Sequence, residues 1–270
     1  MEQCRVAIVV VTWNNEQDIA DCLKSLFNQT EKQLKIIVVD NLSSDQTCEI
    51  VSTQFPEVTL LTPKTNLYLA GGNNLGIRHA LQNFKPQYLM VINPDTKAEP
   101  TMLTEMLKVI DQNKKIGAVG PKVKFWGGKR HGLLYSCGIY FDGFNWAAQI
   151  GHLEKDQEQF NQTQEVFGIE GTCILIRTEM FQQLGGFWEK LKMYLEDVEF
   201  FIRAKKFDWK AVYCPKAVLW HKVMQSTKQN KNLKLEQQKM RNWLLIAFRN
   251  YPLISKLAML KKYLWFKIGL

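Results

Sequence analysis

One carboxylate directly follows an apolar strand and could bind a cation. The run Tyr88–Ile92 is apolar throughout, and Asn93, Pro94 and Asp95 end it. Proline has no N–H to give to a strand ladder, so pairing should stop where Asp95 emerges. Ligands of open α/β sheets bind at the carboxyl ends of such buried strands. We therefore expect Asp95 at a sheet edge, either as a cation ligand or as a solvated turn residue.

Two adjacent acids and a histidine later in the chain could also act on a substrate. Glu196 and Asp197 begin a predicted helix, and His221 ends the last apolar segment. A carboxylate can serve as a general base, and an imidazole can ligate a metal. Acids at a helix start also stabilise it through the helix dipole, and a histidine beside Trp220 can simply be structural. Each residue therefore has a chemical interpretation and a structural one.

Strand and helix alternate over the first 120 residues, which sets how these side chains must be positioned. Strands are expected near 6–11, 36–39, 58–61, 88–92 and 116–120, with helices near 19–27, 45–54, 71–83 and 100–114. Such alternation implies a mostly parallel sheet with helices on both faces and right-handed crossovers. The polar clusters 12–16, 40–45 and 93–95, each after a strand, should then lie on one edge. The glycine-rich stretch 71–76 should open its helix, where free amides favour phosphate.

The second half of the chain is less regular. Asp142 and Gly143 are typical of a hairpin turn, and the polar stretch 153–164 is a candidate acceptor lid. A buried strand at 169–177, a short helix at 180–184 and two short strands at 209–213 and 217–221 should complete the domain.

Composition and charge limit the class of protein. The 270 residues carry a formal net charge of +9, but the segment from Lys222 onwards has eleven Lys or Arg and one acid, Glu236. The basic charge therefore belongs to the tail, which predicts an anionic partner there. Six cysteines without a CxxC pair indicate reduced core residues, and no stretch resembles a signal peptide or a spanning helix. We expect a catalytic domain at 1–225 and a basic, amphipathic helical tail at 226–270.

A family resemblance extends over roughly residues 6–227. Its motifs, in chain order, are Thr12 to Glu16, Val39 to Asp45, Asn66 to Gly76, Asn93 to Thr96, Gly185 to Phe187, Tyr194 to Asp197 and Pro215 to His221. Together they resemble the family 2 glycosyltransferases, in particular the bacterial rhamnosyltransferase-like branch. The resemblance implies the nucleotide-diphospho-sugar transferase (GT-A) fold, a nucleotide-sugar donor, a divalent cation, Mn²⁺ or Mg²⁺, and inversion at the anomeric carbon.

The resemblance also implies roles for individual residues. Donor binding would involve Thr12, Asn14, Glu16, Asp40, Asn73, Asn93 and Asp95. Asp95 and His221 would hold the metal, with Asn93 standing where many members have a second acid. Asp197 would be the general base, with Glu196 as the alternative or as a residue that orients it. Gly185-Gly186-Phe187-Trp188-Glu189 departs from the family pattern, because Trp188 replaces an acid, and this change could alter the choice of acceptor.

The implied function is transfer of a hexose such as rhamnose to a hydroxyl of a glycan or lipid-linked acceptor, as in surface polysaccharide assembly. A nucleotidyltransferase is the first alternative, but the stretch from Thr12 to Glu16 is not the glycine-rich basic loop that it needs. A non-catalytic protein that binds an anionic surface is the second.

No nucleic-acid-binding module accompanies the basic tail, so nucleic acid is not an expected partner. The tail around 242–264 should either lie on an anionic membrane or pack on the catalytic domain. We expect a cytoplasmic protein, with peripheral contact to the inner membrane face in the first case.

Overall fold

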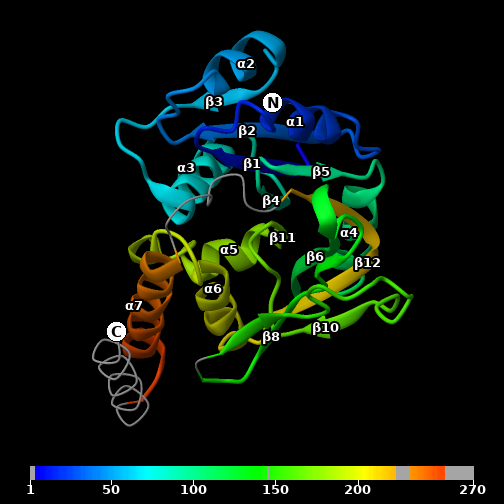
Figure 1. The fold of residues 1–270 in the computed structure, drawn as a ribbon, viewed down its shortest axis with the longest axis vertical. Coiled ribbons are helices and arrows are strands. Elements are labelled where there is room, and N and C mark those ends of the chain that lie inside the picture. Colours follow the sequence, from blue (N-terminus) through cyan, green and yellow to red (C-terminus); the bar gives the residue numbers. More distant parts are fainter. Residues whose placement is uncertain (1–3, 145, 223–231, 253–270) are drawn as a thin grey trace.

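The computed structural model describes residues 4–144, 146–222 and 232–252, built around one large sheet (Figure 1). The strands of this sheet are β1 Val6–Thr12, β2 Leu34–Asp40, β3 Thr59–Leu61, β4 Tyr88–Ile92, β5 Thr96–Ala98, β6 Ile116–Phe125, β7 Leu134–Ser136, β10 Gln164–Val166, β11 Cys173–Arg177 and β12 Lys210–His221. A separate hairpin pairs β8 Ile139–Phe141 with β9 Ala147–Gln149. The helices are α1 Ile19–Phe27, α2 Thr47–Gln54, α3 Tyr68–Asn83, α4 Met102–Ile110, α5 Thr178–Leu184, α6 Glu196–Lys205 and α7 Asn232–Asn250, with 3-10 turns η1 Gly128–Arg130 and η2 Glu189–Leu191.

The predicted α/β fold with a mainly parallel sheet is confirmed. The sheet order is β10-β12-β6-β11-β4-β1-β2-β3, and β3, β2, β1 and β4 all run parallel. Thr12 pairs with Asp40 in register, and Val10 pairs with Ile92. The three polar clusters that follow β1, β2 and β4 therefore share one edge, as predicted.

Strand β11 runs against its neighbours. It is antiparallel to both β4 and β6, whereas β6 and β12 are parallel to each other. Cys173, the first residue of β11, pairs with Ile92, the last residue of β4. The segment that precedes β11 is thereby delivered to the same edge as Asp95, which the sequence did not predict.

Helices cover both faces of the sheet. Alternate residues of β1 point to opposite sides, so that Ile8 packs with α1 and α4 while Val9 packs with α3, α5 and α6. Every residue of β1 is buried, which is why this strand reads as a continuous β-branched run.

The predicted start of α3 is wrong. The helix begins at Tyr68, so Gly72 and Gly76 lie inside it rather than at its phosphate-favouring first turn. A Cβ on Gly72 would lie 2.8 Å from Val11, and one on Gly76 would lie 2.5 Å from Val9. The glycines let the helix approach β1 closely, because any side chain there would overlap the strand's valines.

Other element boundaries also differ from expectation. The segments 209–213 and 217–221 form one strand, β12, whose pairing with β6 shifts register between Cys214 and Val218. Helix α4 is shorter than predicted at both ends. The turn at Asp142 and Gly143 does join an antiparallel hairpin, as predicted.

Hydrogen bonds from a buried lysine hold the stretch 153–164 in place, and the cysteines form no disulfide. Lys122 is buried and donates hydrogen bonds to Asp156 (3.1 Å) and Asn161 (2.8 Å) of this stretch. None of the six cysteines forms a disulfide, and five of them are buried, which agrees with reduced core residues.

The described part of the tail packs on the catalytic domain. Helix α7 lies alongside α6 (Figure 1), and its Ile246 is buried against Val198 and Ile202. Packing is therefore the correct alternative for residues 242–248, while residues 253–270 lie outside the described part. Among the described helices, none has the length and hydropathy needed to cross a bilayer.

We predict that Gly76→Ala destabilises the protein by about 1–3 kcal/mol, because the added methyl group overlaps Val9 in the core. Chemical denaturation measures this change. The double variant Val9→Ala/Gly76→Ala makes room for the methyl group, so it should lose less stability than the two single variants together. Strict additivity would contradict close packing at this position.

Candidate active site at the carboxyl edge of the sheet

The loops after β1 and β2 bind each other through side chains. Asn14 Oδ1 accepts a hydrogen bond from the Ser44 amide (2.8 Å), and the Asn14 amide donates to Ser43 Oγ (2.8 Å). Glu16 Oε2 accepts from the Gln46 amide (3.0 Å). Asn14 has φ 55°, in the left-handed region where asparagine is among the most tolerated non-glycine residues. The two loops that are predicted to bind the nucleotide-sugar donor are thus hydrogen-bonded to each other and form one unit.

Thr12 and Asp40, the other two residues of these loops that are predicted to bind the nucleotide-sugar donor, are buried. Thr12 is 1% exposed, and its Oγ donates to Asn15 Oδ1 (3.0 Å). Asp40 is also 1% exposed and accepts hydrogen bonds from the amide (2.9 Å) and the hydroxyl of Ser43. Both side chains therefore stabilise the conformation of the loops through hydrogen bonds within them.

Asp95 and His221 form a close pair. Strand β5 pairs with the end of β12 so that Thr96 lies opposite His221, and His221 Nε2 lies 3.1 Å from Asp95 Oδ1. Although burial opposes both ionised forms, Asp95 raises the pKa of His221, and His221 lowers the pKa of Asp95. The Lys222 amide also donates to the Asp95 carbonyl (3.0 Å), which fixes the turn.

The reversed strand β11 adds a second acidic group beside this pair. The Asn93 amide donates to the Thr172 carbonyl (2.9 Å), and Thr172 Oγ lies 3.4 Å from His221 Nδ1. The Gly171 amide in turn donates to Asp197 Oδ2 (2.9 Å). This chain of contacts brings the start of α6 to the edge that holds Asp95.

Burial shifts the pKa values of the two adjacent acids apart. Burial, reinforced by the charge of Asp197, raises the pKa of Glu196 to about 8, and Glu196 Oε2 has no hydrogen-bond partner among the described residues. Burial and then Glu170 raise the pKa of Asp197 to about 6. Backbone amides of Val198 and Gly171 offset part of that shift by donating to its carboxylate. Near neutral pH, Glu196 is therefore mainly protonated and Asp197 mainly ionised.

The turn before α6 is conformationally strained. Lys192, Tyr194 and Leu195 have φ values of 64°, 72° and 67°, which cost about 1–3 kcal/mol each in residues other than glycine. The Met193 amide donates back to the Leu191 carbonyl (2.7 Å), closing a γ-turn of the rarer, strained type around Lys192. Glu196 and Asp197 directly follow this turn.

Tyr135 lies close both to the Asp95–His221 pair and to the acids Glu170 and Asp197. Its ring packs edge-on against His221 with centroids 4.9 Å apart. Burial raises the pKa of Tyr135, and the charges of Glu170, Asp197 and Asp95 raise it further. A phenol that responds to all three carboxylates must lie close to both parts of the site.

The residues present fit a divalent cation. Asp95 and His221 offer one carboxylate and one imidazole, and Thr172 on the other ring nitrogen orients the histidine. Within the described residues no group of three or more His, Cys, Asp or Glu is arranged to hold a metal. A cation here would therefore take its remaining ligands from substrate oxygens and water.

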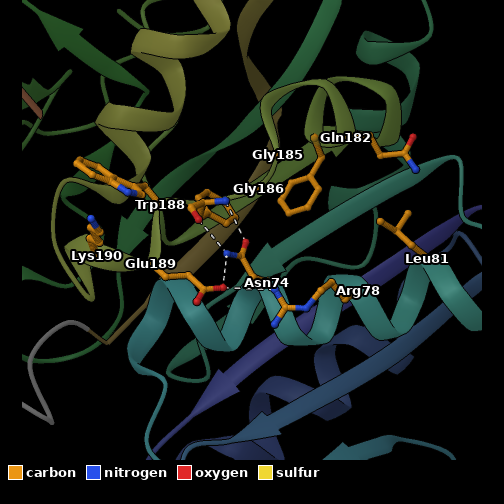
Figure 2. Close-up of a pocket in the computed structure, with 11 residues that line it drawn as sticks. Asn74, Arg78, Leu81, Gln182, Gly185, Gly186, Trp188, Glu189 and Lys190 are labelled. Atoms are coloured by element: carbon orange, nitrogen blue, oxygen red, sulfur yellow. Dashed lines mark hydrogen bonds and ion pairs between the residues drawn. The ribbon is translucent and has the colours of Figure 1, made fainter. Parts of the chain in front are cut away.

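A separate pocket of about 400 Å³ lies between α3 and the α5–α6 connection (Figure 2). Asn74 bridges its two sides, donating to the Phe187 carbonyl (2.8 Å) and to Glu189 Oε1 (2.9 Å). The lining includes none of the residues predicted for catalysis or metal binding. Asn73, the neighbouring predicted donor residue, is buried in α3.

Sequence reasoning missed three residues of the site. Tyr135 lies in the less regular second half of the chain, ahead of the predicted hairpin turn, and no role was predicted for it; Glu170 and Thr172 fell within the predicted buried strand at 169–177. An acid and a threonine on either side of a glycine, just before an apolar run, were the signal that could have identified a loop there.

The fold agrees with known glycosyltransferases. The structure of GalNAc-T7 with UDP, GalNAc and Mn²⁺ superposes with a TM-score of 0.72 at 14% identity, over 91% of this chain and 48% of that one. The mannosyltransferase PcManGT from Pyrobaculum calidifontis, in complex with GDP-Man and Mn²⁺, gives a TM-score of 0.64 at 18% identity, over 97% of this chain and 69% of that one. The chain therefore has the GT-A fold, which was expected from the resemblance.

The sequence comparisons define the family. The model of glycosyl transferase family 2 matches residues 7–185. The chain is also 27% identical over 240 residues to the N-acetylglucosaminyl-diphospho-decaprenol L-rhamnosyltransferase of Mycobacterium tuberculosis. This similarity covers 82% of this chain and 76% of that protein. The chain belongs to glycosyl transferase family 2, and this relative supports the rhamnosyltransferase-like branch.

We predict that stability falls as pH rises from about 6 to about 8, because native Glu196 keeps a proton that the unfolded chain releases. Glu196 alone contributes a slope of at most about 1.4 kcal/mol per pH unit, and His221, whose pKa is also raised, contributes in the same direction. Glu196→Gln should reduce the slope by the share that Glu196 contributes, and the exposed control Glu57→Gln should keep the parent slope. Urea unfolding at several pH values measures the effect, and equal slopes in all three proteins would contradict the burial argument.

Proposed function

We propose that this glycosyltransferase moves a hexosyl group, such as rhamnose, from a nucleoside diphosphate donor to a hydroxyl of a glycan or lipid-linked acceptor, with inversion at the anomeric carbon. The observation that carries the proposal is the Asp95–His221 pair, which lies beside the half-buried carboxylate of Asp197, a group of raised pKa, at one sheet edge. These are the two parts that inverting transfer needs: a site for the diphosphate and its cation, and a base.

The donor would lie across the ends of β1, β2 and β4. Thr12, Asn14, Glu16 and Asp40 belong to the loop unit that would accept the nucleoside, with Asn73, Asn93 and Asp95 towards the diphosphate. Asp95 and His221 would hold Mn²⁺ or Mg²⁺, which when bound offsets the negative charge that builds up on the departing diphosphate. The GT-A neighbours solved with Mn²⁺ support this choice of cofactor.

Asp197 would remove the proton from the acceptor hydroxyl. It is the more acidic of the two adjacent groups and is ionised near neutral pH, whereas protonated Glu196 lacks the charge of a base. The charge of Asp197 would in turn help to keep Glu196 protonated, because burial and then that charge raise the pKa of Glu196. Attack by the acceptor oxygen on the face opposite the diphosphate inverts the anomeric carbon in one displacement.

The acceptor is proposed from similarity. The mycobacterial relative is named for a diphospho-decaprenol acceptor, and a lipid-linked acceptor would suit an enzyme working beside a membrane. The division into a catalytic part, 1–225, and a tail, 226–270, stays a proposal, as do a cytoplasmic location and peripheral contact of the tail with an anionic membrane.

We predict that Asp95→Ala and His221→Ala weaken Mn²⁺-dependent binding of a nucleotide sugar by at least about 10-fold, because each removes a ligand. Calorimetry with a panel of nucleotide sugars and Mn²⁺ measures the affinity. The control Asp21→Ala alters an exposed carboxylate of α1 and should bind as the parent does. If the parent protein binds no nucleotide sugar, the proposed function is wrong.

We predict that Asp197→Asn keeps donor affinity but lowers the transfer rate about 10²- to 10⁴-fold, the usual contribution of a general base. In the parent, kcat/KM should rise with pH through about 6, because the base must be ionised. Full transfer by Asp197→Asn together with loss in Glu196→Gln would assign the base to Glu196.

A further inference from the structure

One asparagine of α7 contacts the strained turn before α6. Asn242 is completely buried, and its Nδ2 lies within hydrogen-bond distance of the carbonyls of Leu191 (3.0 Å), Met193 (3.0 Å) and Tyr194 (2.8 Å). An apolar side chain in place of Asn242 would deprive the Met193 and Tyr194 carbonyls of the donor that Asn242 supplies, at a cost in stability.

The amide of Asn242 is itself oriented by its helix. Its Oδ1 accepts hydrogen bonds from Gln238 Nε2 (3.1 Å) and Arg241 Nη1 (3.2 Å). With the oxygen held on that side, the NH₂ group must face the turn. Gln238 and Arg241 also donate to the carbonyls of Leu191 and Lys190, so they reinforce the same contact.

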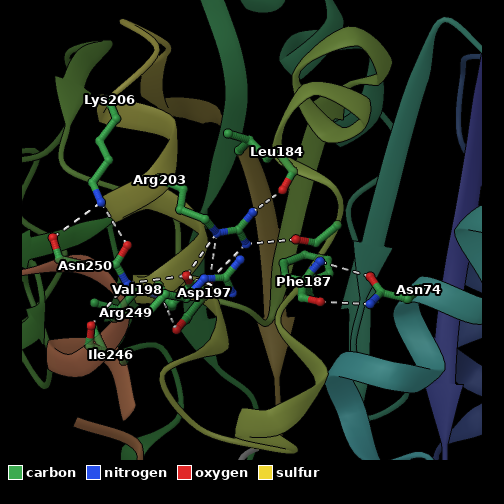
Figure 3. A network of polar contacts seen from close by, with 12 residues as sticks. Asn74, Leu184, Phe187, Asp197, Val198, Arg203, Lys206, Ile246, Arg249 and Asn250 are labelled. Carbon is green, nitrogen blue, oxygen red and sulfur yellow. Dashed lines mark hydrogen bonds and ion pairs between the residues drawn. The ribbon is translucent and has the colours of Figure 1, made fainter. Parts of the chain in front are cut away.

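A second set of contacts joins α7 to the body of α6 (Figure 3). Glu199 is fully buried and pairs with Arg203 of its own helix (2.8 Å) and with Arg249 of α7 (3.3 Å). The Arg249 guanidinium also lies 4.5 Å from the ring centroid of Trp188, the residue that departs from the family pattern. The departure therefore gives α7 a docking surface.

The turn carries the proposed acid–base pair. Lys192, Tyr194 and Leu195 adopt left-handed backbone conformations that these side chains do not favour, and Glu196 and Asp197 follow at once. A strained turn keeps its shape only when surrounding contacts determine it. Asn242 satisfies the carbonyls that this shape turns inward, while the Ala70 amide holds the Lys192 carbonyl from the side of α3 (3.0 Å).

We propose that Asn242 is a positioning residue, which holds the 191–195 turn in its strained form and thereby aims the Glu196–Asp197 pair at the acceptor site. Through Asn242, the tail helix then supports the turn that precedes the proposed base. The catalytic consequence rests on the proposed function, whereas the hold on the turn does not depend on it.

The test is Asn242→Asp, which keeps the shape of the side chain and removes its donors. We expect the transfer kcat to fall about 10- to 100-fold through misplacement of the base, with the donor affinity unchanged, because the donor loops lie elsewhere. Hydrogen exchange of the amides in 192–197 should accelerate in the same variant. Asn242→Ser, which keeps one donor, should recover part of both properties.

Two controls separate positioning from general stability. Asn250→Ala removes hydrogen bonds of α7 to Lys206 and Glu199 in and after α6, and none of these contacts involves the turn, so it should lower the unfolding temperature yet leave kcat and exchange in 192–197 at parent values. Gln237→Ala, an exposed amide on the same helix, should change nothing.

Opposite results would overturn the proposal. These are a kcat within twofold of the parent in Asn242→Asp, or an equal loss in Asn250→Ala. If Asn242→Asp does not fold, the same comparison is made with Asn242→Ser. Absence of transfer in the parent would remove the proposed function, and the exchange measurement would still decide whether Asn242 holds the turn.

Discussion

The reversed direction of β11 is the constraint on which the site depends. In a purely parallel sheet the start of β11 would lie at the amino edge, opposite Asp95. Because β11 is antiparallel to β4, its leading segment meets the end of β4, and the contact between Asn93 and Thr172 locks the two. Gly171 then hydrogen-bonds Asp197, so one strand reversal brings acids from three separate regions to one edge.

Gathering these carboxylates at a partly buried edge is electrostatically costly. The local contacts offset this cost to a different extent for each carboxylate. Asp95 is stabilised by His221, and Asp197 by two backbone amides. Glu196 has no such support for Oε2 and retains its proton instead. Differences in local hydrogen bonding therefore separate groups of similar intrinsic acidity, as the proposed roles of cation ligand, base and neutral acid require.

Much of this arrangement could be predicted from strand ends. Runs of β-branched residues located β1, β2 and β4, and polar residues after each gave the correct shared edge. The start of α3 was missed because Gly72 and Gly76 were interpreted as turn formers, whereas close packing on Val9 and Val11 requires them. The place of Tyr135 in the site and the direction of β11 depend on contacts between distant segments, which no local pattern encodes. The hold of Asn242 on the turn is of the same kind.

The hydrogen bonds between the loops after β1 and β2 have a consequence for substrate entry. Asn14 and Glu16 already satisfy backbone amides of the neighbouring loop before anything binds. A nucleoside bound there, as proposed, would meet a preorganised surface, and little chain entropy would be lost on its arrival. The affinity of these loops for a nucleoside would then depend on contacts already in place and not on ordering of the chain.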